Sequence, residues 1–172
     1  VGMRGRGEVG TLAGVEAAGR PFALRGQALY CGLYLNELLL RLLVRGDAQP
    51  RLFADYLHTL GELATDAAPD GPLRRFELGL LQALGFALQL TLEADGRTPV
   101  AANGRYHYRV DAGPVPAPHD GSYSGDMLLR LERGETLSGP ARNEARQLMR
   151  QVLDHYLGGR PLRSRELFRA NP

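Results

Sequence analysis

The side chains best suited to bind another molecule in this sequence are its arginines. The chain has 172 residues and 21 basic side chains, and every one of these is Arg. Codon usage in a GC-rich genome accounts for most of this bias, but guanidinium groups still bind phosphate and carboxylate groups bidentately. Arg74 and Arg75 fall in the first turn of an expected helix, where positive charge opposes the helix dipole. They indicate a site for an anionic partner, with a solvated helix start as the alternative.

A second group of arginines lies close to the C-terminus. Its members are Arg160, Arg163, Arg165 and Arg169. One interpretation is a strip that contacts phosphates, since each such contact adds to salt-dependent affinity. The other is that these residues pack the last helix against the rest of the protein, with Glu166 paired internally. The sequence leaves both interpretations open.

Residues that could support catalysis form no recognisable set. A hydrolase could use His119, Asp120 and Asp126, but no Ser or Cys nucleophile lies in a known motif. Asp154 and His155 are adjacent, and adjacent residues in a helix do not face each other. We therefore expect no catalytic residues, and keep hydrolysis only as a minor alternative.

Metal and cofactor sites are not indicated either. The single cysteine, Cys31, excludes an internal disulfide and a zinc site built from several cysteines. The stretch 5–10 matches G-x-G-x-x-G, but no strand precedes it and no amphipathic helix follows it, as a dinucleotide site requires. We expect neither a cofactor nor a metal.

Charge is distributed unevenly along the chain. Residues 1–25 carry a net charge of +2, residues 157–172 carry +3, and the body between them carries −3. Basic ends on a mildly acidic body suit an electrostatic contact made by the ends. No signal peptide or transmembrane segment is evident, so a cytoplasmic location is the default expectation.

Hydrophobic spacing predicts a mainly α fold. The segment Ala28–Val44 has leucines on nearly every side, which predicts a buried central helix with a narrow polar seam. Within it, Glu37 and Arg41 are spaced to pair. Further helices are expected at Pro50–Ala64, Leu73–Leu90, Gly125–Arg133, Ser138–Leu157 and Pro161–Arg169. We expect a compact helical bundle around the central helix.

Two short stretches predict β structure. Arg105–Val110 alternates like a strand inside an irregular insert over residues 91–124. The aromatic residues Tyr106 and Tyr108 could stack on bases, but this alternation more often means one buried and one solvated face. Ser124 is a predicted N-cap, and a second short strand is expected around Glu8–Leu12.

Four stretches in the same order resemble the RecO family of bacterial recombinational repair proteins. The most specific is the C-terminal run YLGGRPLRSRELFR at 156–169. The others are LYLNELL at 33–39, LFADYLH at 52–58, and LRRFELGLL at 73–81, which Leu84 and Gly85 follow. Together they extend over most of the chain.

The resemblance implies an N-terminal OB-fold domain and a C-terminal helical domain. Residues 1–20 then correspond to the terminal strand of a missing or incomplete OB-fold domain, and residues 21–172 to the helical domain. On such a strand, Arg4 and Arg6 extend the nucleic-acid-binding surface. Some relatives carry a four-cysteine zinc module after the third long helix. The matching region, 91–110, has no cysteine here, and His107 alone cannot replace that site.

The resemblance also implies a mediator rather than an enzyme. RecO proteins bind single- and double-stranded DNA, anneal strands, act with RecR, and dock on the acidic C-terminal tail of single-stranded DNA-binding protein (SSB) to help load RecA. By position, Arg74 and Arg75 correspond to the tail-binding arginines. Phe76, Leu78 and Leu81 are the candidate pocket-wall residues. The implied location is bacterial, cytoplasmic and nucleoid-associated. The alternative function is a helical nucleic-acid-binding or regulatory module unrelated to repair.

Overall fold

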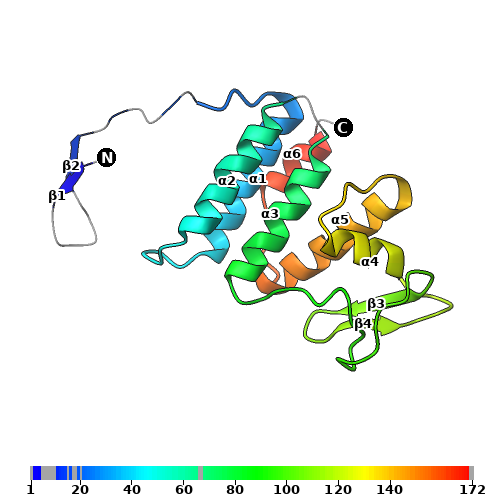
Figure 1. Cartoon of the computed structure of the whole chain (residues 1–172). Helices are drawn as coiled ribbons and strands as arrows, with labels where there is room; N and C mark the ends of the chain where they lie inside the picture. The colour runs from blue at the N-terminus through cyan, green and yellow to red at the C-terminus, as the bar shows by residue number, and fades with distance from the viewer. Residues whose placement is uncertain are drawn as a thin grey trace.

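The fold is mainly helical, with one small β insert, as predicted. The computed structural model describes residues 2–4, 11–14, 16, 19, 21–65 and 68–170. Within these residues there are six helices, a two-stranded sheet and a three-stranded sheet (Figure 1). The helices are α1 (Gly26–Leu42), α2 (Pro50–Leu63), α3 (Asp70–Ala83), α4 (Gly125–Glu132), α5 (Gly139–Tyr156) and α6 (Ser164–Ala170).

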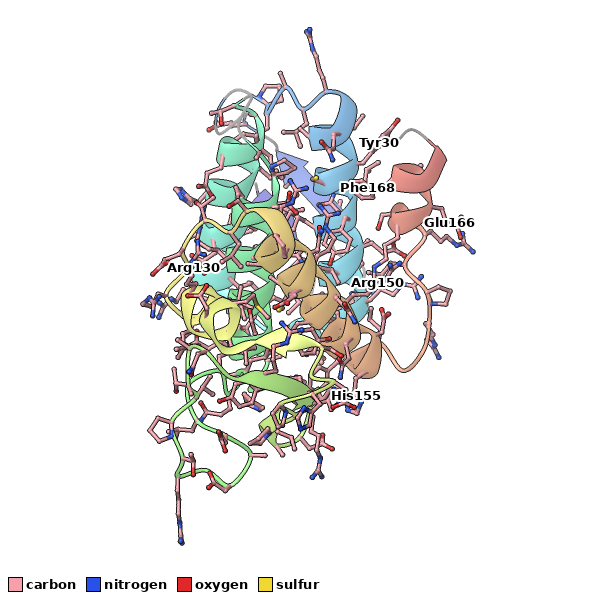
Figure 2. The ribbon with its side chains drawn as sticks, turned by 90° about the vertical axis from the view of Figure 1, so that its right-hand side faces the viewer. Tyr30, Arg130, Arg150, His155, Glu166 and Phe168 are labelled. Atoms are coloured by element: carbon pink, nitrogen blue, oxygen red, sulfur yellow. The ribbon has the colours of Figure 1, made fainter. Side chains whose placement is uncertain are left out.

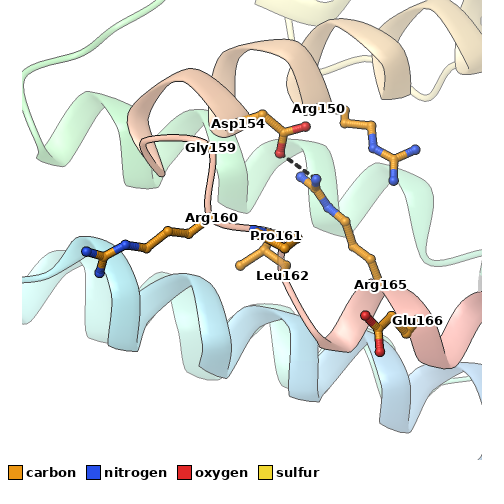
Figure 3. A pocket seen from close by; sticks show the side chains of 8 residues that line it. All are labelled: Arg150, Asp154, Gly159, Arg160, Pro161, Leu162, Arg165 and Glu166. Atoms are coloured by element: carbon orange, nitrogen blue, oxygen red, sulfur yellow. Dashed lines mark hydrogen bonds and ion pairs between the residues drawn. The ribbon is translucent and has the colours of Figure 1, made fainter.

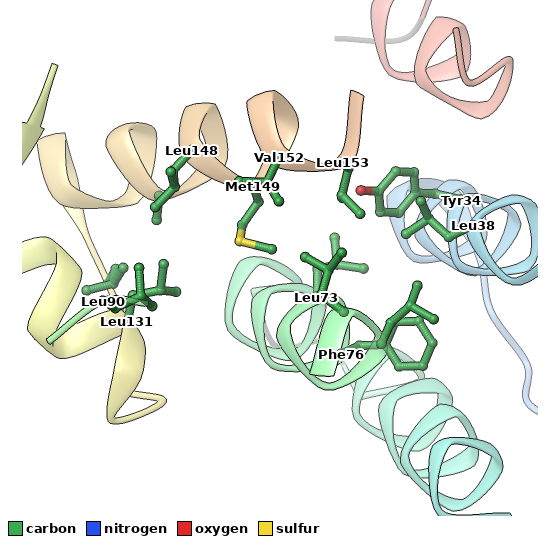
Figure 4. Packing of buried hydrophobic residues seen from close by; sticks show 14 of the residues in the cluster. Tyr34, Leu38, Leu73, Phe76, Leu90, Leu131, Leu148, Met149, Val152 and Leu153 are labelled. Carbon is green, nitrogen blue, oxygen red and sulfur yellow. The ribbon is translucent and has the colours of Figure 1, made fainter. Parts of the chain in front are cut away.

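The helices pack as two connected groups. α1, α2 and α3 lie side by side, and α6 packs against α1 (Figure 1). α5 contacts both α3 and α4 and so connects this group to the insert. In Figure 4, Leu148 of α5 lies towards Leu90 and Leu131, Met149 lies between Leu131 and Leu73, and Leu153 lies towards Tyr34. One hydrophobic core therefore extends from the insert to α1.

α1 is amphipathic, and the expectation that it is buried nearly all round is wrong on one side. Cys31, Leu35 and Leu38 are fully buried, but Leu40 is 83% exposed. The leucine count could not show which side of the helix has neighbours, and α2 and α6 cover only part of its surface. The predicted pair of Glu37 and Arg41 is confirmed at 2.9 Å.

α3 is displaced towards the N-terminus relative to the predicted segment Leu73–Leu90. It begins at Asp70 and ends at Ala83, because Gly85 adopts a φ of +82° that stops the helix. The amide of Phe86 donates to the carbonyl of Leu81 at 2.8 Å and completes this cap. Residues 86–90 form no helix, although their apolar spacing suited one. The ranges of α2, α4, α5 and α6 agree with prediction to within a few residues.

The insert forms the three-stranded antiparallel sheet. Its strands are β3 (Arg105–Arg109), β4 (Gly113–Pro116) and β5 (Tyr123–Ser124), with β3 in the centre. Tyr106 lies opposite Pro116 on one side and Tyr123 on the other. Tyr106 and Tyr108 are buried and His107 is exposed, which confirms the predicted half-buried strand.

Glu144 of α5 holds the insert against the helices. Its carboxylate accepts hydrogen bonds from the Ser124 amide at 2.7 Å, the Ser124 hydroxyl at 2.8 Å and the Arg105 guanidinium at 2.7 Å. Ser124 also caps α4 as predicted, because its hydroxyl accepts from the Met127 amide at 3.3 Å. The same residue therefore begins α4 and joins the insert to α5.

The N-terminal sheet pairs β1 (Gly2–Arg4) with β2 (Thr11–Gly14) in antiparallel orientation. The strand predicted around Glu8–Leu12 overlaps β2 at Thr11 and Leu12, whereas Glu8 lies outside the described residues.

Candidate functional site

The two arginines at the start of α3 point to different surroundings. The Arg74 side chain is only 13% exposed and donates from Nη2 to Glu77 Oε1 at 2.7 Å. Arg75 faces outward and forms an ion pair with Glu62 of α2. The pair is not one continuous guanidinium surface, and Arg75 is its accessible member.

Arg74 belongs to a buried polar cluster with Glu77 and Tyr34. Glu77 is fully buried and also accepts a hydrogen bond from the Tyr34 hydroxyl at 2.6 Å. Burial raises the pKa of the Glu77 carboxyl, and the nearby Arg74 charge and the Tyr34 hydrogen bond offset this only in part. Within the described residues, Glu77 Oε2 and Arg74 Nε have no hydrogen-bond partner. Sequence reasoning missed this cluster, because Tyr34 and Glu77 are 43 residues apart.

The apolar residues predicted beside these arginines are mostly in the core. Phe76 is 2% exposed, Leu81 is fully buried, and Leu78 is half-buried. Phe76 lies against Tyr56, with ring centroids 6.3 Å apart. Of the three predicted wall residues, only Leu78 can contact a peptide without opening the core.

A small hollow adjoins Arg74 on the side of α5. It is lined by Asp70, Gly71, Arg74, Glu135, Leu137, Arg142 and Ala145. Its volume is about 10 Å³, which is room for no more than one water molecule. A bound peptide would therefore lie across its mouth, where Arg74 and Arg142 come from two different helices.

Two of the C-terminal arginines, Arg160 and Arg165, line a larger hollow where the chain turns from α5 into α6 (Figure 3). The turn uses Gly158 and Gly159, both with positive φ. The hollow has a volume of about 240 Å³. It is lined by Arg150, Asp154, Gly159, Arg160, Pro161, Leu162, Arg165 and Glu166.

The predicted members of this group differ in what they contact. Arg165 is 16% exposed and donates to Asp154 at 2.5 Å, so it does join α6 to α5. Arg160 and Arg163 are exposed and have no ion-pair partner among the described residues. Arg6 lies outside the described residues, as do the side chains of Arg4 and Arg169.

α6 is held in place by Glu37 of α1. The Glu37 carboxylate accepts from the Arg163 amide at 3.1 Å, the Ser164 amide at 2.8 Å and the Ser164 hydroxyl at 2.7 Å. Burial alone would raise the pKa of Glu37, but these hydrogen bonds and the Arg41 charge outweigh it, so the pKa is lowered. The orientation of the C-terminal arginines therefore depends on a carboxylate more than 120 residues away.

The residues of the hydrolase alternative are engaged separately. Asp120 lies 3.4 Å from His107, and Asp126 lies in the first turn of α4, 3.5 Å from Arg130. His119 is exposed. Across the described ranges, no three His, Cys, Asp or Glu side chains gather in a way that could hold a metal ion.

The aromatic side chains of the insert serve its packing. The Tyr106 hydroxyl accepts from the Ala101 amide at 2.9 Å and contacts Glu93 at 3.3 Å. Burial raises the pKa of Tyr108. These rings are not exposed for base stacking.

In the part of the chain that the structure describes, no helix has the length and apolar character needed to cross a bilayer.

The fold and these surfaces define a helical domain with exposed arginines beside two hollows. Residues 24–166 match the protein family Recombination protein O C terminal. The chain is 45% identical to the DNA repair protein RecO of Methylococcus capsulatus over 172 residues, which is 99% of this chain and 71% of that protein. It is 46% identical to RecO of Pseudomonas aeruginosa, over 96% of this chain and 71% of that protein. It is 47% identical to RecO of Halorhodospira halophila, over 99% of this chain and 74% of that protein.

The chain therefore belongs to the RecO family of DNA repair proteins. Members of this family are recombination mediators and not enzymes. The resemblance found in the four sequence stretches is confirmed.

Proposed function

We propose that this protein acts as a recombination mediator that binds single- and double-stranded DNA, the SSB C-terminal tail and RecR. In this role it helps to load RecA and to anneal strands. The observation that carries the proposal is the hollow between α5 and α6 that Arg160 lines, with Arg163 following it in the chain. Both side chains are exposed and have no ion-pair partner within the described residues. Exposed guanidinium groups of this kind suit phosphate contacts.

The tail site is proposed at the start of α3. Arg75 is the group that can reach a carboxylate, at the expense of its exposed pair with Glu62. Leu78 is the accessible apolar residue beside it. Arg74 contributes positive charge from below the surface, although its guanidinium already pairs with Glu77.

Residues 1–20 are proposed to belong to an OB-fold domain, and residues 21–172 to the helical domain with its insert at 91–124. The antiparallel pairing of β1 with β2 supports a β domain at this end of the chain. Arg4 and Arg6 would then extend the DNA-binding surface.

The tail proposal is tested by fluorescence anisotropy with a labelled SSB-tail peptide. Replacing Arg75 by Gln is expected to weaken binding about 10- to 100-fold, because a charge-assisted hydrogen bond contributes roughly 1.5–3 kcal/mol. Arg51→Gln, an exposed arginine on α2, is the matched control. Peptide with an amidated C-terminus should bind the wild type as weakly as the acid peptide binds the Arg75 variant.

Arg74 requires a different design, because its removal leaves the buried Glu77 carboxylate unpaired. Such a change destabilises a protein by about 3–5 kcal/mol, so lost binding could simply reflect unfolding. The double variant Arg74→Gln, Glu77→Gln removes both buried charges together. If this variant and the Arg75 variant both bind the tail normally, the site is not at the start of α3.

A further inference from the structure

Three arginines of α5 form a regular series that connects the two hollows described above. Arg142, Arg146 and Arg150 are spaced four residues apart, so their side chains lie on one face and rise by about 6 Å at each step. All three are exposed. The next position in the series is Asp154.

Arg165 of α6 supplies a fourth guanidinium at this end of the series. Its Nη1 lies 2.5 Å from Asp154 Oδ1 (Figure 3). The Arg165 guanidinium therefore lies next to the fourth position of the series, which Asp154 occupies. We call Arg142, Arg146, Arg150 and Arg165 the arginine row. The row ends at the hollow that Arg150, Arg160 and Arg165 line together.

Two acidic residues lie near the other end of the row, but Glu135, which lines the same hollow as Arg142, pairs with Arg130 and Arg133. Asp70 of α3 lies 2.8 Å from Arg146 and 3.7 Å from Arg142. Arg150 has no ion-pair partner among the described residues, and Figure 2 shows it on α5. One carboxylate shared by two guanidinium groups leaves this end of the row positively charged.

The exposed side chains of α5 that flank the row are polar. From residue 142 onward, the exposed residues of α5 are Arg142, Asn143, Arg146, Gln147, Arg150, Gln151 and His155. An acidic peptide anchored by apolar side chains needs an apolar pocket, and from residue 142 onward none of the exposed residues of α5 has an apolar side chain. Guanidinium groups flanked by amides instead suit phosphates and the polar edges of a nucleic acid strand.

We propose that the arginine row is a track for the sugar–phosphate backbone of a nucleic acid strand, located on the helical domain itself. The strand runs along α5 and reaches the C-terminal arginines at the hollow. This inference rests on the proposed DNA-binding function and assigns it a surface along α5, which adds Arg142 and Arg146 to the hollow that Arg150 lines.

The test compares two triple variants of the whole 172-residue chain. One replaces Arg142, Arg146 and Arg150 by Gln. The other replaces Arg51, Arg97 and Arg109, which are also exposed and unpaired among the described residues, and therefore changes the net charge equally. Anisotropy of a labelled oligothymidylate is measured with both variants and the wild type over a series of salt concentrations.

Loss of three phosphate contacts should reduce the slope of log affinity against log salt by about 2. At ~0.1 M salt the same loss weakens binding on the order of 10- to 100-fold. The control variant should retain a slope close to that of the wild type. Equal losses of affinity in the two variants would contradict the proposal that the row binds the strand, but not the proposal that the protein binds DNA. A wild type that binds no oligonucleotide would overturn both proposals.

Asp70→Asn separates this role from a structural one. If the row binds phosphates, removing the competing carboxylate should raise oligonucleotide affinity severalfold. If Arg142 and Arg146 only join α5 to α3, affinity should stay the same or fall, which would contradict the proposal. Circular dichroism and urea midpoints establish that each variant is folded. The proposal would also be contradicted if the variant lacking Arg142, Arg146 and Arg150 lost SSB-tail binding but retained oligonucleotide binding.

Discussion

Glu77 is a carboxyl group in an environment very different from that of a free side chain in water. It is fully buried, and burial raises its pKa despite the nearby Arg74 charge and the Tyr34 hydrogen bond. Its pKa is then higher in the folded state than in the unfolded state. The stability that it contributes is fully present below its ordinary pKa of 4.5 and is lost as pH rises through the raised value.

Comparing Glu77→Gln with the wild type by urea unfolding, from about pH 5 to about pH 8, tests this sign. The free energy of unfolding of the wild type, minus that of the variant, should fall as pH rises, by at most ~1.4 kcal/mol per pH unit. A difference that is constant or rises with pH would show that the Glu77 pKa is not raised.

Glu144 provides a control of opposite sign. Burial would raise its pKa, but hydrogen bonds from Ser124 and the pairing with Arg105 outweigh this and lower it. The free energy of unfolding of the wild type, minus that of Glu144→Gln, should therefore be constant above about pH 4.5. It should fall as pH drops through the lowered pKa of Glu144.

At the scale of elements, α6 depends on Glu37 more than on its own sequence. It has only seven residues, which is too short for a stable isolated helix. Two backbone amides at its start and the Ser164 hydroxyl donate to the Glu37 carboxylate. This carboxylate acts as a cap supplied by α1.

Glu37→Gln should loosen α6 while leaving α2 and α3 protected. Amide hydrogen exchange of residues 165–168 should accelerate by about tenfold or more, because a hydrogen bond to a charged group contributes about 1.5–3 kcal/mol. Glu132→Gln is the control, since Glu132 is exposed and unpaired within the described part of the chain. Unchanged exchange in α6 would mean that packing against α1 alone holds this helix.

The orientation of α1 can be tested with two leucines that are two residues apart. Leu38 is fully buried and Leu40 is 83% exposed. Replacing Leu38 by Ala should lower the free energy of unfolding by about 2–5 kcal/mol. Replacing Leu40 by Ala should change it by no more than about 0.5 kcal/mol. Urea unfolding of both variants measures the difference, and similar losses would show that both faces of α1 are buried.

Local patterns predicted most elements of this fold, and long-range contacts account for what they missed. The Ser124 cap, the alternation in β3 and the spacing in α2 and α5 each depend on neighbouring residues, and all are confirmed. The exposed side of α1 depends on where other helices pack. The role of Glu37 likewise depends on Ser164, 127 residues away. For the site, the sequence indicated Arg74 and Arg75 but could not show that one is buried against Glu77.

At the scale of the whole molecule, α5 links the regions proposed to bind partners. Its buried face contacts the insert through Glu144 and the core through residues such as Met149. Its exposed face carries the arginine row. The row begins beside the hollow that Arg74 and Arg142 both line. An SSB tail at α3 and a strand on α5 would thus place negative charges close together.

This proximity predicts that the two ligands weaken each other. A saturating SSB-tail peptide should lower the affinity for labelled oligothymidylate by about fivefold or more, and by linkage the oligonucleotide should weaken tail binding by the same factor. The repulsion should diminish at high salt, because exposed charges are screened over about 10 Å at 0.1 M ionic strength. A tail peptide whose acidic side chains are replaced by amides should have less effect at equal occupancy. Binding of either ligand that is unaffected or strengthened by the other would show that the two sites do not share this field, and would separate the tail site from the row.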